Sequence, residues 1–197
     1  MRSIKKFCIT SLALVFICAM PIKNRYTLSS EYTVTIHGTS NLHNWDEKVG
    51  SVSGEGAVDL NADGAYDVNT LDIKMEVHSI KSDMGSIMNN NTYKALKADA
   101  NPQIILTLSE PLKGLQMRGG EKTVSAKVNL TIAGVTRPVT MLVKIAMLEG
   151  KKLSVEGSQV ITMTDYGIKP PTALLGTLKT GNEITINFKT SFTAKEN

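Results

Sequence analysis

Apolar and polar residues alternate along most of the chain beyond residue 26. In one clear stretch the apolar positions are Val124, Ala126, Val128, Leu130 and Ile132, and the residues between them are polar. The same alternation recurs over residues 32–37, 71–77, 104–108, 139–145, 153–163 and 184–192. A period of two places one face of a strand in an apolar interior and the other in water, which is typical of antiparallel sheets. Glycine, asparagine and aspartate separate the runs, so the sequence predicts an all-β protein of about eight strands, a barrel or a sandwich.

One segment, residues 82–99, breaks the alternation and has helical character in its second half. Asn91 suits a helix N-cap, Tyr93 and Leu96 fall on one face, and Pro102 limits the far end. The asparagine run at residues 89–91 is a poor helix interior, so we expect two short helical pieces with a break. Such an insertion would plug one end of a barrel or cover an open face. Since no linker-like composition or repeat interrupts the chain, we expect a single domain.

The N-terminus has the layout of a secretory signal peptide. Arg2, Lys5 and Lys6 precede an uncharged, mostly apolar run at residues 7–20. We therefore predict a signal peptide over about residues 1–22 and a mature domain over residues 23–197. The protein would be exported, to the periplasm in a Gram-negative host and to the medium otherwise. An uncleaved membrane anchor is the alternative.

Removing that segment changes the charge and the thiol content. The chain has 22 Lys and Arg against 18 Asp and Glu, and loss of Arg2, Lys5 and Lys6 leaves 19 against 18. The remaining basic residues are scattered, which argues against nucleic acid as a partner. Both cysteines, Cys8 and Cys18, lie in the predicted signal peptide, so the mature domain would have no disulfide and no thiol chemistry.

Catalytic and metal-binding patterns are weak. The three histidines, His37, His43 and His78, match no zinc spacing. His43 lies close to Asp46, but a general base also needs a nucleophile within reach, and no Gly-x-Ser-x-Gly motif occurs. We therefore predict no catalytic residue, no metal and no cofactor.

The inward positions of the predicted strands are candidates for a ligand cavity. An eight-stranded barrel holds either one small ligand or packed side chains, and the sequence leaves both open. Aliphatic and methionine walls suit a flexible hydrocarbon chain better than a flat ring. The candidate lining residues are Leu106, Leu108, Val128, Leu130, Met141, Val143, Met163, Ile186 and Phe188.

Four residues near the ends of the strands are candidates for contact with a polar head group: His43, Trp45, Arg137 and Asp165. Each also has a structural interpretation. Trp45 would plug the barrel end, and Arg137 would pair with a carboxylate such as Asp165 and hold two loops together. A long loop predicted over residues 169–181 contains Leu174 and Leu175, which suit a lid or a partner contact.

Five segments in order resemble the YceI-like family. They are residues 38–45 (GTSNLHNW), 79–82 (SIKS), 96–104 (LKADANPQI), 130–139 (LTIAGVTRPV) and 164–168 (TDYGI) followed by Pro170 and Pro171. The resemblance implies an exported, lipocalin-like, eight-stranded antiparallel barrel with a helical insertion. It also implies a long apolar cavity that holds a polyisoprenoid or a similar amphiphile.

The sequence therefore predicts an exported carrier, not an enzyme, with an isoprenoid-like or fatty amphiphile as its partner. Transient contact with a membrane and formation of a homodimer are further expectations. A low aromatic content of 5% agrees with an interior built for a chain-like ligand. The alternative is a stress-related or surface interaction module with a solid barrel core.

Overall fold

The computed structural model describes residues 22–117, 120–173 and 176–195. Over these residues the chain forms twelve strands. They are β1 (Ile22–Ser40), β2 (Asn44–Val49), β3 (Val52–Leu60), β4 (Tyr66–Glu76), β5 (Ile80–Ser82), β6 (Gln103–Leu108), β7 (Leu112–Leu115), β8 (Lys122–Ile132), β9 (Val135–Leu148), β10 (Lys152–Thr162), β11 (Thr172–Ala173) and β12 (Leu178–Ala194). The helix is α1 (Ser86–Ala95), and three short 3-10 turns are η1 (Val77–Ser79), η2 (Glu149–Lys151) and η3 (Met163–Tyr166).

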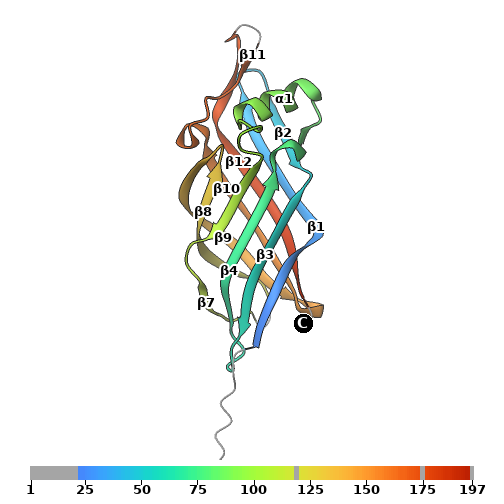
Figure 1. Cartoon of the computed structure of the whole chain (residues 1–197), viewed down its shortest axis with the longest axis vertical. Helices are drawn as coiled ribbons and strands as arrows, with labels where there is room; N and C mark the ends of the chain where they lie inside the picture. The colour runs from blue at the N-terminus through green and yellow to red at the C-terminus, as the bar shows by residue number, and fades with distance from the viewer. Residues whose placement is uncertain (1–21, 118–119, 174–175, 196–197) are drawn as a thin grey trace, which may run out of the picture.

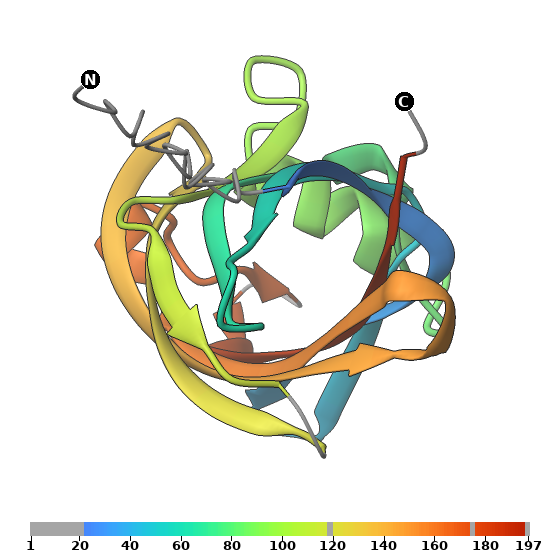
Figure 2. The same ribbon diagram turned by 90° about the horizontal axis from the view of Figure 1, so that it is seen from below.

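Eight of the strands form a closed antiparallel barrel. Their order around the ring is β1, β3, β4, β6, β8, β9, β10 and β12, and β12 then pairs with β1. This closing ladder runs from Tyr26 opposite Ala194 to Ser40 opposite Thr180. Figure 2 shows the ring from below, and Figure 1 shows its length from the side. The predicted all-β, eight-stranded, lipocalin-like barrel is confirmed.

Short strands extend the barrel at one end, and another short strand, β7, pairs with β4 toward the other end. Strand β2 lies beside the last part of β1 and pairs with β5, while β11 pairs with the first part of β12. These strands and α1 lie at the end drawn at the top of Figure 1, which we call the α1 end. The expected loop over residues 169–181 is thus partly wrong, because it contains β11 and the start of β12. Its Leu174 and Leu175 lie outside the described residues.

The helical insertion is one continuous helix and not two pieces. α1 includes residues 89–91, and its N-cap position is Gly85 instead of Asn91. Tertiary hydrogen bonds explain why this polar run stays helical. The Asn89 side-chain oxygen accepts from the Ser82 amide at 2.8 Å, and the Thr92 hydroxyl donates to Glu47 at 2.6 Å. Such contacts override a weak intrinsic propensity. In the described ranges no helix is both long and apolar enough to cross a bilayer.

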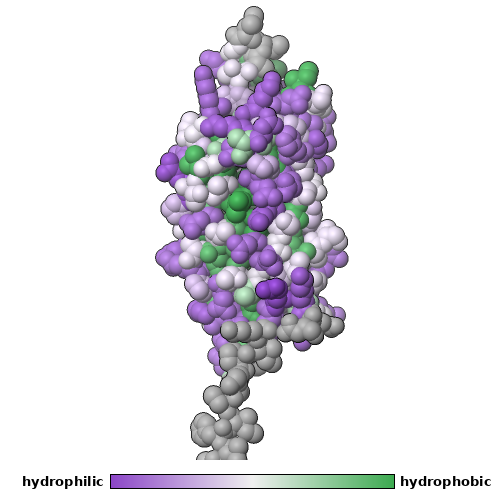
Figure 3. All heavy atoms as spheres, viewed as in Figure 1, coloured by the Kyte–Doolittle hydropathy of each residue, from purple (hydrophilic) through white to green (hydrophobic). Residues whose placement is uncertain are grey.

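The alternation along the strands produces the inside and outside of the barrel. Along β8, for example, Ala126, Val128, Leu130 and Ile132 are buried, and Lys127 between them is exposed. The face of the barrel drawn in Figure 3 is largely polar with scattered apolar residues. The buried side chains form two clusters, one toward the α1 end around Trp45 and Ile104 and one toward the opposite end around Val128 and Phe192.

Replacing Phe192 by alanine should test the second cluster. Phe192 is 1% exposed, so F192A leaves a large void beside β1 and β10, and we expect a loss of about 3–5 kcal/mol in the free energy of unfolding. Urea denaturation measures this. Leu142→Ala is the control, because Leu142 is 66% exposed and its truncation should cost no more than about 0.5 kcal/mol. Equal losses in the two variants would contradict the assignment of the core.

Candidate functional site

The barrel interior contains two cavities, one above the other. The upper cavity, toward the α1 end, has a volume of about 120 Å³, and the lower cavity has a volume of about 110 Å³. Ile186 lines both, so the two cavities are neighbours on either side of this residue. A packed protein interior has few voids larger than a water molecule. The side chains therefore leave apolar space in the barrel, although each cavity is smaller than the roughly 300–1,000 Å³ of a typical ligand pocket.

The wall of the lower cavity is almost entirely apolar. Two of its lining residues are polar, Gln159 and Thr190. The Gln159 amide donates to the Val160 carbonyl at 2.9 Å and the Thr190 hydroxyl donates to the Val155 carbonyl at 3.1 Å, so both donors are occupied by backbone. This section can accept hydrocarbon, but it has little with which to orient a polar group.

The structure places all nine predicted lining residues in the cavity walls. Those in the lower cavity are Leu106, Leu108, Val128, Leu130, Met141, Val143, Ile186 and Phe188. Met163 lines the upper cavity, together with Ile186. Their contact with a ligand stays a prediction.

The upper cavity combines apolar walls with a polar side. Its apolar wall includes Trp45 and Met88, and its polar residues are Glu47, Asn91, Thr92, Thr172 and Thr180. Three of these five come from β2 and α1, which pack against each other through the bond between Thr92 and Glu47. Polar groups in the interior are thus concentrated at the α1 end.

Trp45 lies in the wall of this upper cavity, buried to 8% exposure. Its indole nitrogen donates to the Thr39 carbonyl at 3.2 Å. The ring crosses Gly38 on the neighbouring strand, where a Cβ would clash with it. The absence of a side chain at Gly38 therefore lets the indole lie flat against β1. Trp45 therefore borders the upper cavity, and both its role as a plug of the barrel end and its contact with a head group stay predictions.

Glu47 is the site residue that the sequence reasoning missed. It is 2% exposed and lines the upper cavity. Burial raises the pKa of its carboxyl, and the hydrogen bond from Thr92 opposes that change. A sequence signal existed, because Trp45, Glu47 and Val49 share the inward phase of β2 while Asp46 and Lys48 face out.

The other three predicted head-group residues lie away from the cavity walls. His43 is exposed, and its carbonyl accepts hydrogen bonds from the Ser40 amide and hydroxyl in a tight turn. Arg137 is exposed and donates through Nε to the Asp165 backbone carbonyl at 2.9 Å. The expected pairing of Arg137 with a carboxylate is therefore wrong in its acceptor, and the bond joins the start of β9 to η3 instead of two loops. Contact of these residues with a head group stays a prediction.

The histidines lie on the outer surface. His37 contacts Asp46 at 2.7 Å and His78 lies 4.0 Å from Asp99. In the part of the chain that the structure describes, no three His, Cys, Asp or Glu side chains gather as metal ligands would.

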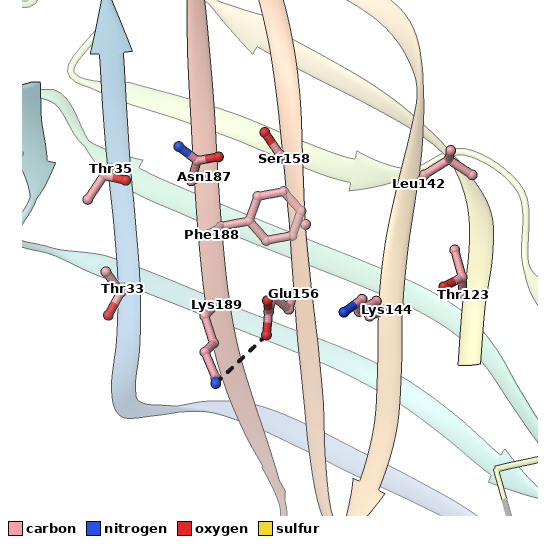
Figure 4. A pocket seen from close by; sticks show the side chains of 11 residues that line it. Thr33, Thr35, Thr123, Leu142, Lys144, Glu156, Ser158, Asn187, Phe188 and Lys189 are labelled. Atoms are coloured by element: carbon pink, nitrogen blue, oxygen red, sulfur yellow. Dashed lines mark ion pairs between the residues drawn. The ribbon is translucent and has the colours of Figure 1, made fainter. Parts of the chain in front are cut away.

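A separate hollow of about 510 Å³ lies on the outside of the barrel wall (Figure 4). Thr33, Leu142 and Lys144 are among its lining residues, and Lys189 lies 3.7 Å from Glu156 within it. Its walls are mostly outward-facing polar side chains, so it is a weaker candidate for an apolar ligand than the interior. Gly157 and Phe188 also line it, and Phe188 lines the lower cavity as well.

The closed antiparallel barrel and its interior cavities define a lipocalin-like protein. The sequence pattern of the YceI-like domain matches residues 26–192, which is most of the chain. The protein therefore belongs to the YceI-like family, as its motifs predicted. No curated protein matches the chain.

Solved structures agree on the fold. A polyisoprenoid binding domain from Saccharophagus degradans, implicated in plant cell wall breakdown, is 14% identical with a TM-score of 0.68, covering 86% of this chain and 98% of that one. BcnA from Burkholderia cenocepacia is 18% identical with a TM-score of 0.60 (82% and 96% covered). The YceI protein of Campylobacter jejuni is 16% identical with a TM-score of 0.57 (77% and 85% covered). At these identities the likeness establishes the fold alone.

The buried carboxyl gives a pH-dependent stability. Because the pKa of Glu47 is raised in the folded protein, its contribution to stability is present below the ordinary value of 4.5 and is lost as the pH rises through the raised pKa. Wild type should therefore lose stability relative to E47Q on going from about pH 4 to about pH 8, by at most about 1.4 kcal/mol per pH unit in that window. Urea denaturation of both proteins across this range measures the difference.

Glu55→Gln is the matched control, since Glu55 is exposed on β3. The free energy of unfolding of E55Q should change with pH in the same way as that of wild type between about pH 4 and about pH 8. Wild type gaining stability over E47Q with rising pH would contradict the raised pKa.

Proposed function

We propose that this protein is an exported carrier that holds one isoprenoid-like or other long-chain amphiphile inside its barrel. The hydrocarbon tail enters the lower cavity, whose aliphatic and methionine walls repack to widen it beyond its volume of about 110 Å³, and the polar end lies in the upper cavity. Apolar burial supplies the affinity, at about 25 cal/mol per Å² before the costs of association. The polar groups at the α1 end orient the ligand.

One observation carries this proposal: the two cavities are neighbours that share Ile186 in their walls, and their polar residues are concentrated at one end. An amphiphile has the same division between an apolar tail and a polar end. A ligand that was polar throughout would leave its hydrogen bonds unmade in the lower cavity, at a cost of about 1–3 kcal/mol for each group. The interior thus favours a chain with a single polar terminus.

Two further lines of support come from outside the cavity. The solved structure from Saccharophagus degradans is described as a polyisoprenoid binding domain, and it shares this fold. Export is supported by the basic and then apolar pattern of residues 1–20, which lie outside the described residues. Transient membrane contact and a homodimer stay predictions.

Binding is favoured over both alternatives. A solid interaction module requires a filled barrel, and the two cavities argue against it. An enzyme requires a nucleophile or a paired acid and base near the ligand, and His43 with Asp46 lies on the outer surface instead. The cavity walls offer groups that bind and orient.

Solvent extraction of the purified protein and mass spectrometry of the extract test the proposal. The expected result is a molecule with a long apolar chain, in a ratio near one for each protein. Protein stripped of lipid should gain thermal stability when an isoprenoid alcohol is added, because a ligand that binds the folded state stabilises it. A protein that is always empty and gains no stability from isoprenoid alcohols or long-chain amphiphiles would rule out the carrier function.

Ala126→Leu tests whether the lower cavity holds the tail of the ligand. Ala126 is buried opposite Met141 and lines that cavity, so the larger side chain occupies space needed by the tail. We expect binding of an isoprenoid alcohol to weaken by roughly tenfold or more, as extra methylenes in an interior typically cost about 1–3 kcal/mol. Ala100→Leu, at an exposed position, is the matched control and should bind like wild type. Thermal melts without ligand verify that both variants fold.

A further inference from the structure

Glu47 is the one ionisable residue among those that line the two cavities. It is held in the middle of β2, opposite Ile36 on β1 and Ser82 on β5. Its side chain is 98% buried and faces the upper cavity. A charged group in such a place is costly unless it is paired.

Within the described ranges the carboxyl of Glu47 has a single partner. The Thr92 hydroxyl donates to Oε1 at 2.6 Å, and no described residue donates to Oε2. None of the described lysine, arginine or histidine side chains forms an ion pair with it. The raised pKa of Glu47 agrees with a carboxyl that lacks a cation.

A purely structural role does not explain an acid at this position. A hydrogen bond between β2 and α1 could be made equally well by a glutamine, which carries no charge to bury. Burying a carboxylate costs several kcal/mol, whereas one hydrogen bond to it returns about 1.5–3 kcal/mol. The second oxygen is thus an acceptor with no described partner, in a cavity that we assign to the polar end of a ligand.

We propose that Glu47 is the recognition group of the upper cavity and selects amphiphiles whose polar end donates hydrogen bonds and carries no negative charge. This inference rests on the proposed carrier function. A primary ammonium is the best match, because it forms a charge-assisted hydrogen bond with the carboxylate. A hydroxyl donates one neutral bond. A carboxylate or phosphate end would bring a second negative charge next to Glu47, which is unfavourable in a poorly solvated site.

Three probes with the same tail test this selectivity: dodecylamine, dodecanol and dodecanoate. Trp45 is the single tryptophan and lines the upper cavity, so its fluorescence reports occupancy. In the wild type we expect dodecylamine to bind at least about tenfold more tightly than dodecanoate, the size of effect that a hydrogen bond to a charged group produces. In E47Q this ratio should fall to less than about threefold.

Two further variants complete the design. Glu47→Met fills similar space without polar atoms and should lose the preference in the same way as E47Q. E55Q makes the same chemical change on the outer face and should keep the wild-type ratio. A ratio that is unchanged in both E47Q and E47M, or wild type that binds dodecanoate as tightly as dodecylamine, would overturn the role of Glu47.

The failure of this inference and the failure of the carrier function have different signatures. If the three probes bind with equal affinity, the carrier function survives and the role of Glu47 does not. If neither the probes nor an isoprenoid alcohol such as farnesol binds, the carrier function itself fails, and the inference fails with it.

Discussion

The ladder between β1 and β12 is the interaction on which the interior depends. It joins the first and last strands of the barrel, which are separated by almost the whole chain, and so turns an open sheet into a ring. Closure removes the exposed sheet edges and fixes which residues face inward. Its register sets Ile186 opposite Ile36 and Phe188 opposite Val34, and these inward pairs form walls of the cavities. A shift of one residue would exchange the inward and outward faces.

Closure alone would give a uniform apolar tube, and the α1 end makes the two halves different. At this end β2, β5 and α1 pack beside the barrel strands. They place Glu47, Asn91 and Thr92 in the wall of the upper cavity. The helix stays in place partly because its polar residues bond to the barrel, through Asn89 to Ser82 and Thr92 to Glu47. The polar side chains that disfavour an isolated helix, such as those of Asn89 and Thr92, therefore hold this helix against the barrel. The same attachment places a buried acid where the polar end of a ligand would lie.

The barrel was predictable because its signal is local and repeated along each strand. Period-two alternation placed Val128, Met141 and Phe188 inside without any knowledge of which strands pair. The single helix was not predictable from propensity, because the bonds of Asn89 and Thr92 involve strands far from them in sequence. Glu47 is marked by the alternation of Trp45, Glu47 and Val49, but the sequence does not show that an acid at this inward position is buried, because its burial depends on the pairing of β2 with both β1 and β5. Arg137 and Asp165 were correctly placed together, but the acceptor is a carbonyl that no sequence pattern indicates.

The central claim is that the interior holds an amphiphile in one direction, with its polar end at the α1 end. Quenching of Trp45 by long-chain alcohols that carry a nitroxide either beside the hydroxyl or at the far end of the tail tests this most directly. The account predicts stronger quenching by the label beside the hydroxyl, because Trp45 lines the upper cavity. Stronger quenching by the label at the far end, or equal quenching by both, would contradict it.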